Sequence, residues 1–144
     1  MRACYVDTCL LLLLFLQDEG YPAAERWLAC ATDQSLWISH WGLLEFAGVV
    51  ATRLRRGDLI PRRCDQIHAE LELFRRERLA LLEPRGEDVL KTCQLVQSHP
   101  VSGLRSGDAL HLALASRHAL PLVSADQRLV RAAQRMGIAA ELVG

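Results

Sequence analysis

The feature that most constrains this chain is the alternation of short apolar segments with longer stretches of helical periodicity. Four short segments, which are apolar except for Ser35, are predicted as buried strands, at residues 3–6, 35–38, 79–82 and 120–123. Residues 138–143 are a candidate fifth strand. Helical stretches separate these segments. The pattern predicts an α/β fold, a three-layer α/β/α sandwich with a short, mostly parallel central sheet.

The predicted helices cover residues 9–17, 22–31, 40–55, 61–76, 86–97 and 109–119, and a seventh follows Asp126. Ser39 is a good N-cap for the third helix, and Gly57 is a typical residue to end it. Pro61 fits the first turn of the fourth helix. Repeats and low-complexity linkers are absent from the sequence. We therefore expect one domain over residues 1–144.

Composition narrows the class of protein. Of the 144 residues, 51% are hydrophobic and 24% are charged, which is typical of a globular chain. The formal net charge is zero, so overall charge gives no support for nucleic-acid binding. The five cysteines include no Cys-x-x-Cys pair, which favours reduced, mostly buried thiols in a cytoplasmic protein. The apolar run after Asp7 covers only residues 10–16, far short of the roughly 20 that span a membrane.

Four acidic residues stand in apolar surroundings. Asp7 and Asp126 follow the first and fourth predicted strands, at the sheet edge where ligand sites gather in open parallel sheets. Glu45 lies mid-helix within Leu-Leu-Glu-Phe-Ala, and Asp108 heads a helix that is apolar nearly all round. Removing an unpaired carboxylate from water costs several kcal/mol, so these side chains need partners.

Each acid also has an ordinary structural explanation. Asp7, Asp108 and Asp126 could cap the helices that follow them. Glu45 could face solvent or pair with an arginine one turn away. Taken singly, these explanations are the better ones. Capping does not account for the whole set, because Glu45 is mid-helix and Asp7 lies between two apolar runs.

Four carboxylates together are typical of a divalent-metal site. Mg²⁺ and Mn²⁺ prefer hard oxygen ligands, and such a site can activate a water and stabilise charge on a phosphodiester. A metal would also offset the repulsion among the carboxylates.

The sequence resembles the PIN-domain family, and within it the VapC-type toxins of bacterial type II toxin–antitoxin systems. Four motifs carry the resemblance, in order and along essentially the whole chain: Val6-Asp7-Thr8, the mid-helix Glu45, Ser106-Gly107-Asp108-Ala109-Leu110-His111-Leu112-Ala113, and Ser124-Ala125-Asp126-Gln127-Arg128-Leu129. The segment around Asp108 is the most specific of the four. One departure is Cys9, where many members carry serine.

The resemblance implies an Mg²⁺-dependent endoribonuclease, with Mn²⁺ as a possible substitute, that hydrolyses RNA with a metal-activated water. It implies Asp7 and Asp108 as metal ligands, and Glu45 and Asp126 as the residues that complete the acidic pocket. Thr8 and Ser124 match positions where the family keeps a hydroxyl. The implied partners are RNA, a second copy of the chain, and a cognate antitoxin whose tail occupies the acidic groove, with operator DNA reached only through that complex.

Several other residues have an expected role in or near the site. His111 is expected to be a packed, hydrogen-bonded histidine rather than a general base. Arg105 is the best candidate to contact a phosphate, whereas the arginines between residues 53 and 63 and between 75 and 78 are expected to be solvated. Trp37 and Trp41 are expected in the core. The leucines of residues 10–16 and the face of the next helix that carries Trp27 are expected to exceed what a small core can bury, which favours a partner interface there.

Two rival functions remain open on the sequence. One is a binding module that represses its own operator with an antitoxin and has no significant nuclease activity. The other is a metal-dependent phosphatase or a receiver-like domain. A phosphatase would usually begin with Asp-x-Asp, but Cys9 takes the place of the second acid. A receiver needs a lysine late in the chain, and Lys91 is the only lysine and is misplaced for that role.

Overall fold

A computed structural model describes residues 2–144 and contains one five-stranded, all-parallel sheet with the strand order β3-β2-β1-β4-β5. The strands are β1 (Arg2–Val6), β2 (Gln34–Ser39), β3 (Leu79–Leu82), β4 (Leu122–Ser124) and β5 (Ala140–Leu142). The helices are α1 (Thr8–Leu16), α2 (Tyr21–Cys30), α3 (His40–Arg56), α4 (Pro61–Arg78), α5 (Gly86–Ser98), α6 (Ser106–Arg117) and α7 (Gln127–Arg135).

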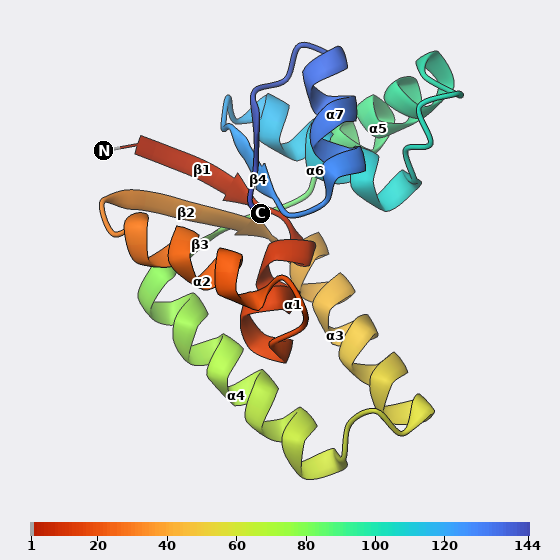
Figure 1. Cartoon of the computed structure of the whole chain (residues 1–144). Coiled ribbons are helices and arrows are strands. Elements are labelled where there is room, and N and C mark those ends of the chain that lie inside the picture. Colours follow the sequence, from red (N-terminus) through yellow and green to blue (C-terminus); the bar gives the residue numbers. More distant parts are fainter. Residues whose placement is uncertain (1) are drawn as a thin grey trace.

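Helices cover both faces of the sheet, with α1 to α4 on one side and α5 to α7 on the other (Figure 1). Strand alternation explains the two cores, because successive side chains point to opposite faces. In β1, Cys4 and Val6 belong to the core under α1 to α4, while Tyr5 belongs to the core under α5 to α7. The predicted three-layer sandwich is confirmed.

Element boundaries differ from the prediction mainly in the second half of the chain. The fourth strand was predicted at residues 120–123 but lies at Leu122–Ser124, and β5 is shorter than the apolar pattern indicated. The helix of Asp108 begins three residues earlier than expected, at Ser106. Asp108 therefore lies inside the first turn of α6, and the N-cap is Arg105. The prediction that Asp108 could cap this helix was wrong.

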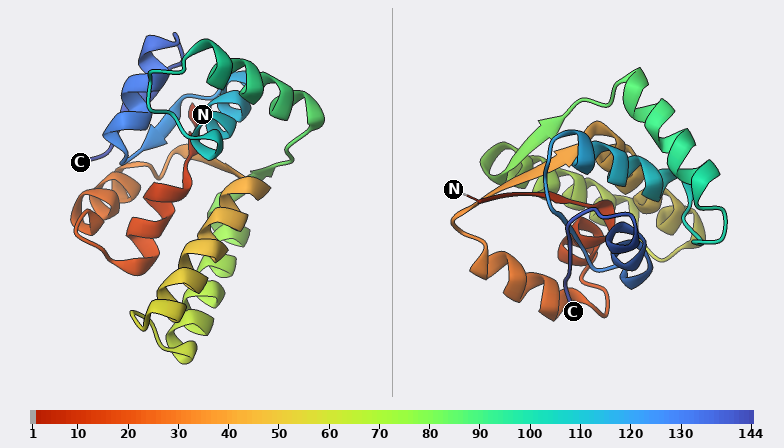
Figure 2. Two further views of the ribbon diagram at one scale, coloured as in Figure 1. Left: turned by 90° about the vertical axis from the view of Figure 1, so that its right-hand side faces the viewer. Right: turned by 90° about the horizontal axis from the view of Figure 1, so that it is seen from above.

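The helix ends that position α3 follow the sequence signals. Ser39 Oγ accepts a hydrogen bond from Gly42 N (3.1 Å), which satisfies one of the free N–H groups of the first turn. Gly57 ends the helix in the left-handed conformation, with φ of 82°, where a Cβ would be strained. Helix α3 then runs beside α4, and the pair extends away from the sheet (Figure 2).

The strand order reverses direction between β1 and β4. From β1 the chain builds outward to β2 and β3 on one side, and to β4 and β5 on the other. In open α/β sheets the helices leave opposite faces at this point, so the carboxyl ends of the two central strands face a crevice. Asp7 directly follows β1, and Ser124 is the last residue of β4.

The structure shows how far the apolar side chains and the cysteines are exposed at the surface. Leu10 and Leu11 are buried, while residues 12–16 and Trp27 are only partly buried against the core, so a partner interface there stays a prediction. The large exposed apolar side chains of residues 2–144 include Leu44, Ile60, Leu90 and Val101. All five cysteines are free, as predicted, but only Cys4 and Cys64 are buried. Helices long and apolar enough to cross a membrane are absent from the described part of the chain.

Candidate active site

The four acids singled out in the sequence meet at the carboxyl edge of the sheet. Asp7, Glu45, Asp108 and Asp126 all line one cavity of about 190 Å³, together with Thr8, Cys9 and His111. The acids come from four separate parts of the fold: the end of β1, the middle of α3, the first turn of α6 and the N-cap of α7. Residues more than a hundred positions apart thus form one acidic cluster.

Asp7 is buried, with 3% of its surface exposed. Its Oδ1 accepts from Leu10 N (3.1 Å) and caps α1, and its Oδ2 accepts from Ser124 Oγ (2.6 Å). Burial raises the pKa of Asp7 to about 6, and the charge of Asp126 adds to the rise, while these hydrogen bonds oppose it. Capping is therefore a real role of Asp7, but it leaves the carboxylate poorly compensated in its charged form.

Glu45 is held by a buried hydrogen-bonded chain. Its Oε1 accepts from Thr8 Oγ1 (2.7 Å) and from His111 Nε2. A carboxylate only accepts, so Nε2 carries the proton, and in a neutral ring Nδ1 then accepts from the Tyr5 hydroxyl (2.6 Å). The Tyr5 hydroxyl also meets Ser39 Oγ (2.8 Å). Burial alone would raise the pKa of Glu45, but the hydrogen bonds from His111 and Thr8 lower it below its ordinary value.

His111 was expected to be packed and hydrogen-bonded, and this is confirmed: it is buried, and both of its ring nitrogens are in hydrogen bonds. It is not a free base. Its contribution is to fix the rotamer of Glu45, because the bond to Oε1 comes from a ring that is itself locked by Tyr5. Tyr5 was missed in the sequence, where it looked like an ordinary strand residue, and Ser39 was predicted only as a helix cap and not as a partner of Tyr5.

Asp108 is half-buried, and its carboxylate takes part in no hydrogen bond or ion pair within residues 2–144. Burial raises its pKa, and the charges of Asp126 and Glu45 add to the rise. The residue before it, Gly107, permits a close approach of α3 to α6. A Cβ on Gly107 would lie 3.0 Å from Trp41 Cζ2 and 3.1 Å from Glu45 Oε2.

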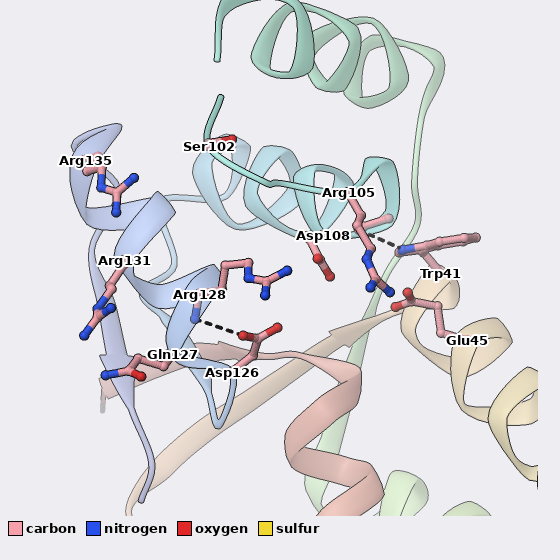
Figure 3. A pocket seen from close by; sticks show the side chains of 11 residues that line it. Trp41, Glu45, Ser102, Arg105, Asp108, Asp126, Gln127, Arg128, Arg131 and Arg135 are labelled. Carbon is pink, nitrogen blue, oxygen red and sulfur yellow. Dashed lines mark hydrogen bonds between the residues drawn. The ribbon is translucent and has the colours of Figure 1, made fainter. Parts of the chain in front are cut away.

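Asp126 is the N-cap of α7, as its ordinary explanation predicted. Its Oδ1 accepts from Arg128 N (2.9 Å) and Leu129 N (3.3 Å). Ser124 links the two strand ends, because its Oγ donates to Asp7 and accepts from Asp126 N (2.9 Å). The other oxygen of Asp126, Oδ2, has no hydrogen-bond partner within the described residues. It points into the cavity (Figure 3).

A wider cavity of about 870 Å³ opens above the acids. Glu45, Asp108 and Asp126 line its floor, and four arginines line its walls: Arg105, Arg128, Arg131 and Arg135 (Figure 3). Arg105 was predicted in the sequence. The three arginines of α7 were missed, and so was Trp41, which was expected in the core but is half-buried at the cavity edge with Nε1 donating to Gly107 O (3.1 Å).

The arginines between residues 53 and 63 and between 75 and 78, which were expected on solvated faces, do not line either cavity, and several of them form ion pairs. Arg53 pairs with Asp18 (2.6 Å), and Arg75 and Arg76 both pair with Glu72. These contacts occupy their guanidinium groups on the outer helices.

The donor set fits a hard divalent cation. Asp108 and one oxygen of Asp126 are free of protein partners within residues 2–144, and the raised pKa values of Asp7 and Asp108 reflect charge that a cation would offset. Over the same residues, no three His, Cys, Asp or Glu side chains lie close enough to ligate one ion as they stand. Mg²⁺ typically takes one or two carboxylates and keeps several waters. Cys9 is a poor ligand, because burial and the surrounding acids raise its pKa to about 12.

The family model for the PIN domain matches residues 4–135 of this sequence. The chain belongs to the PIN-domain family. The match covers every element that carries one of the four acids. No curated protein sequence matches at a significant level.

Solved structures with the same fold include components of toxin–antitoxin complexes. The structure of VapBC2 from Rickettsia felis bound to a promoter DNA fragment matches with a TM-score of 0.74 and 15% identity, over 99% of this chain and 100% of that chain. DNA-bound VapBC from Salmonella typhimurium matches with a TM-score of 0.69 and 20% identity, over 98% of each chain. VapC20 of Mycobacterium tuberculosis, a Sarcin-Ricin loop cleaving toxin, matches with a TM-score of 0.72 and 15% identity, over 94% of this chain and 95% of that chain. At these identities the likeness establishes that this PIN domain shares their fold.

Proposed function

We propose that this protein is an Mg²⁺-dependent endoribonuclease and the toxin of a type II toxin–antitoxin pair. The observation that carries the proposal is the convergence of Asp7, Glu45, Asp108 and Asp126 on one cavity at the point where the strand order reverses. Capping explains two of these residues and leaves Glu45 and Asp108 unexplained. Membership of the PIN-domain family and the shared fold with a Sarcin-Ricin loop cleaving toxin support the same reaction class.

The residues have distinct roles in this proposal. Asp7 and Asp108 hold the metal, and Asp126 and Glu45 complete its surroundings directly or through water. When bound, Mg²⁺ supplies a Lewis acid that lowers the pKa of a water and offsets charge on the phosphodiester. Mn²⁺ can replace it, because both ions prefer oxygen ligands.

The neighbours of the acids keep them in place. Ser124 fixes Asp7 through a 2.6 Å hydrogen bond, and Thr8 and His111 fix Glu45. Arg105 carries no ion pair within residues 2–144 and lines the same cavity as Asp108, which supports a role in binding a substrate phosphate.

The test is cleavage of RNA by the purified protein with added Mg²⁺ or Mn²⁺. We expect Asp108→Asn to reduce the cleavage rate by at least about 100-fold, equivalent to about 3 kcal/mol of transition-state stabilisation. Asp33→Asn is the matched control, because Asp33 is exposed and lies outside both cavities, and it should cleave like the unmodified protein. Equal rates for Asp108→Asn and the unmodified protein would refute the proposal.

The proposed partners are a cognate antitoxin and a second copy of the chain. The shared fold with VapBC complexes, some of them bound to DNA, supports an antitoxin partner. A pure binding module without nuclease activity is the rival. It predicts that expression has the same effect on growth with and without Asp108→Asn, whereas the nuclease proposal predicts toxicity that this change removes.

A further inference from the structure

Helix α7 presents a row of three arginines to the large cavity. Arg128, Arg131 and Arg135 follow the spacing i, i+3 and i+7, so they share one face of the helix. The opposite face is buried in the core through Leu129, Val130, Ala132 and Ala133. With a rise of 1.5 Å per residue, the row is about 10 Å long. Arg128 points toward Asp108 and Asp126, and Arg131 and Arg135 lie farther from the acids (Figure 3).

These three side chains have no bonding partner within the described residues. None of them forms an ion pair or a side-chain hydrogen bond over residues 2–144. Among the described residues, six other arginines are in ion pairs: Arg53, Arg63, Arg75, Arg76, Arg85 and Arg117. The row is therefore a set of exposed charges with free donors.

Helix stability does not account for the row either. Like charges at i, i+3 and i, i+4 destabilise a helix by a few tenths of a kcal/mol per pair. A cation in the first turn, where Arg128 lies, opposes the helix dipole. Only Arg135, in the last turn, is placed favourably for the dipole.

We propose that Arg128, Arg131 and Arg135 bind successive backbone phosphates of a single-stranded RNA as it leaves the acidic cluster. This inference rests on the proposed ribonuclease function and adds the path of the substrate. A polyanion is repelled by four carboxylates, and a chain of zero net charge provides no general attraction. A local row of guanidinium groups, which bind phosphates through two donors at once, supplies that attraction on one side of the site.

The shape of the cavity favours a single strand. Its 870 Å³ lies between α7 on one side and the Trp41 and Glu45 end of α3 on the other. Walls on both sides suit a few nucleotides of an unpaired strand, which proteins hold through a basic groove that follows the backbone.

RNA binding tests the proposal without requiring cleavage. Fluorescence anisotropy of a labelled single-stranded oligouridine is measured in an Asp108→Asn background, with Mg²⁺, over a range of salt concentrations. The row variant is Arg131→Gln with Arg135→Gln, whose side chains are exposed. The matched control is Arg26→Gln with Arg62→Gln, which removes the same charge from exposed positions on α2 and α4.

We expect the row variant to raise the Kd at least about tenfold at low salt, while the control changes it by less than about twofold. Loss of two phosphate contacts should lower the slope of log K against log salt by about 1.4, at about 0.7 per contact for a single strand. Equal Kd and slope for the row variant and the control overturn the proposal.

A second probe separates RNA from an acidic protein segment. If the row instead captures such a segment, the row variant loses binding to polyglutamate and keeps its binding to oligouridine, which also overturns the proposal. If the unmodified protein cleaves no RNA, the nuclease function is refuted. The anisotropy measurement still tests whether the arginine row binds RNA, because it does not depend on cleavage.

Discussion

Replacing Asp7 with asparagine should stabilise the metal-free protein at neutral pH. The pKa of Asp7 rises from its ordinary value of 3.8 to about 6 in the folded state, chiefly through burial. At 1.36 kcal/mol per pH unit, the charged carboxylate costs the fold about 3 kcal/mol at pH 7. Asparagine removes this charge and can keep the local contacts, since its oxygen can accept from Leu10 N and its amide can donate to Ser124 Oγ. We expect a net gain of about 1 to 3 kcal/mol.

The sign of the pH dependence follows from the same shift. A raised carboxyl pKa means that the folded protein binds more protons than the unfolded chain between pH 3.8 and about 6, so stability falls as pH rises through this window. The advantage of Asp7→Asn should grow across the window and stay constant above it. Urea unfolding with a chelator, followed by tryptophan fluorescence, measures this at each pH.

Metal should reverse the order of stability. Mg²⁺ at 1,000 times its Kd would add about 4.1 kcal/mol to the unmodified protein, which exceeds the expected advantage of Asp7→Asn, and would add much less to the variant. The reasoning is refuted if Asp7→Asn is less stable than the unmodified protein at pH 7 without metal and has the same pH dependence. Capping of α1 would then be the main role of Asp7. Asp33→Asn, an exposed acid, is the control.

Two further substitutions test the packing around the site. Gly107→Ala places a Cβ 3.0 Å from Trp41 and 3.1 Å from Glu45 Oε2, so we expect about 1 kcal/mol lower stability and about tenfold slower RNA cleavage, measured by urea unfolding and single-turnover kinetics. Arg117→Met leaves buried Asp88 without its two-point ion pair (2.5 and 2.9 Å), so thermal unfolding should show a loss of about 3 kcal/mol at pH 7. Burial would raise the pKa of Asp88 but Arg117 lowers it, so this loss should shrink as pH falls below about 4.

The fold and the acids could be predicted from the sequence because the strands and the acids each differ clearly from the residues around them. Short strands stand out as apolar segments between helices, and Asp7, Glu45 and Asp108 stand out as charges inside apolar runs. Asp126 was weaker evidence alone, since its capping role is visible in the sequence and is confirmed in the structure.

The supporting residues could not be predicted because their roles depend on distant partners. Tyr5 reaches His111 across 106 positions, and nothing near either residue in the sequence indicates the contact. Trp41 looked like a core residue on an apolar helix, yet the start of α3 lies at the edge of the cavity. The sequence analysis gave no role to the arginine row of α7, because only the packing of α7 beside the acids brings these side chains to the same cavity.

The most direct test of the account is calorimetric titration of Mn²⁺ into the unmodified protein and into Asp108→Asn at neutral pH. Asp108 carries a carboxylate without protein partners in residues 2–144, so its removal should affect the metal far more than the fold. We predict that the unmodified protein binds Mn²⁺ at least about tenfold more tightly than Asp108→Asn, with Asp33→Asn unchanged. Equal affinities in all three proteins, or no binding by the unmodified protein, would contradict a metal site built from these four acids.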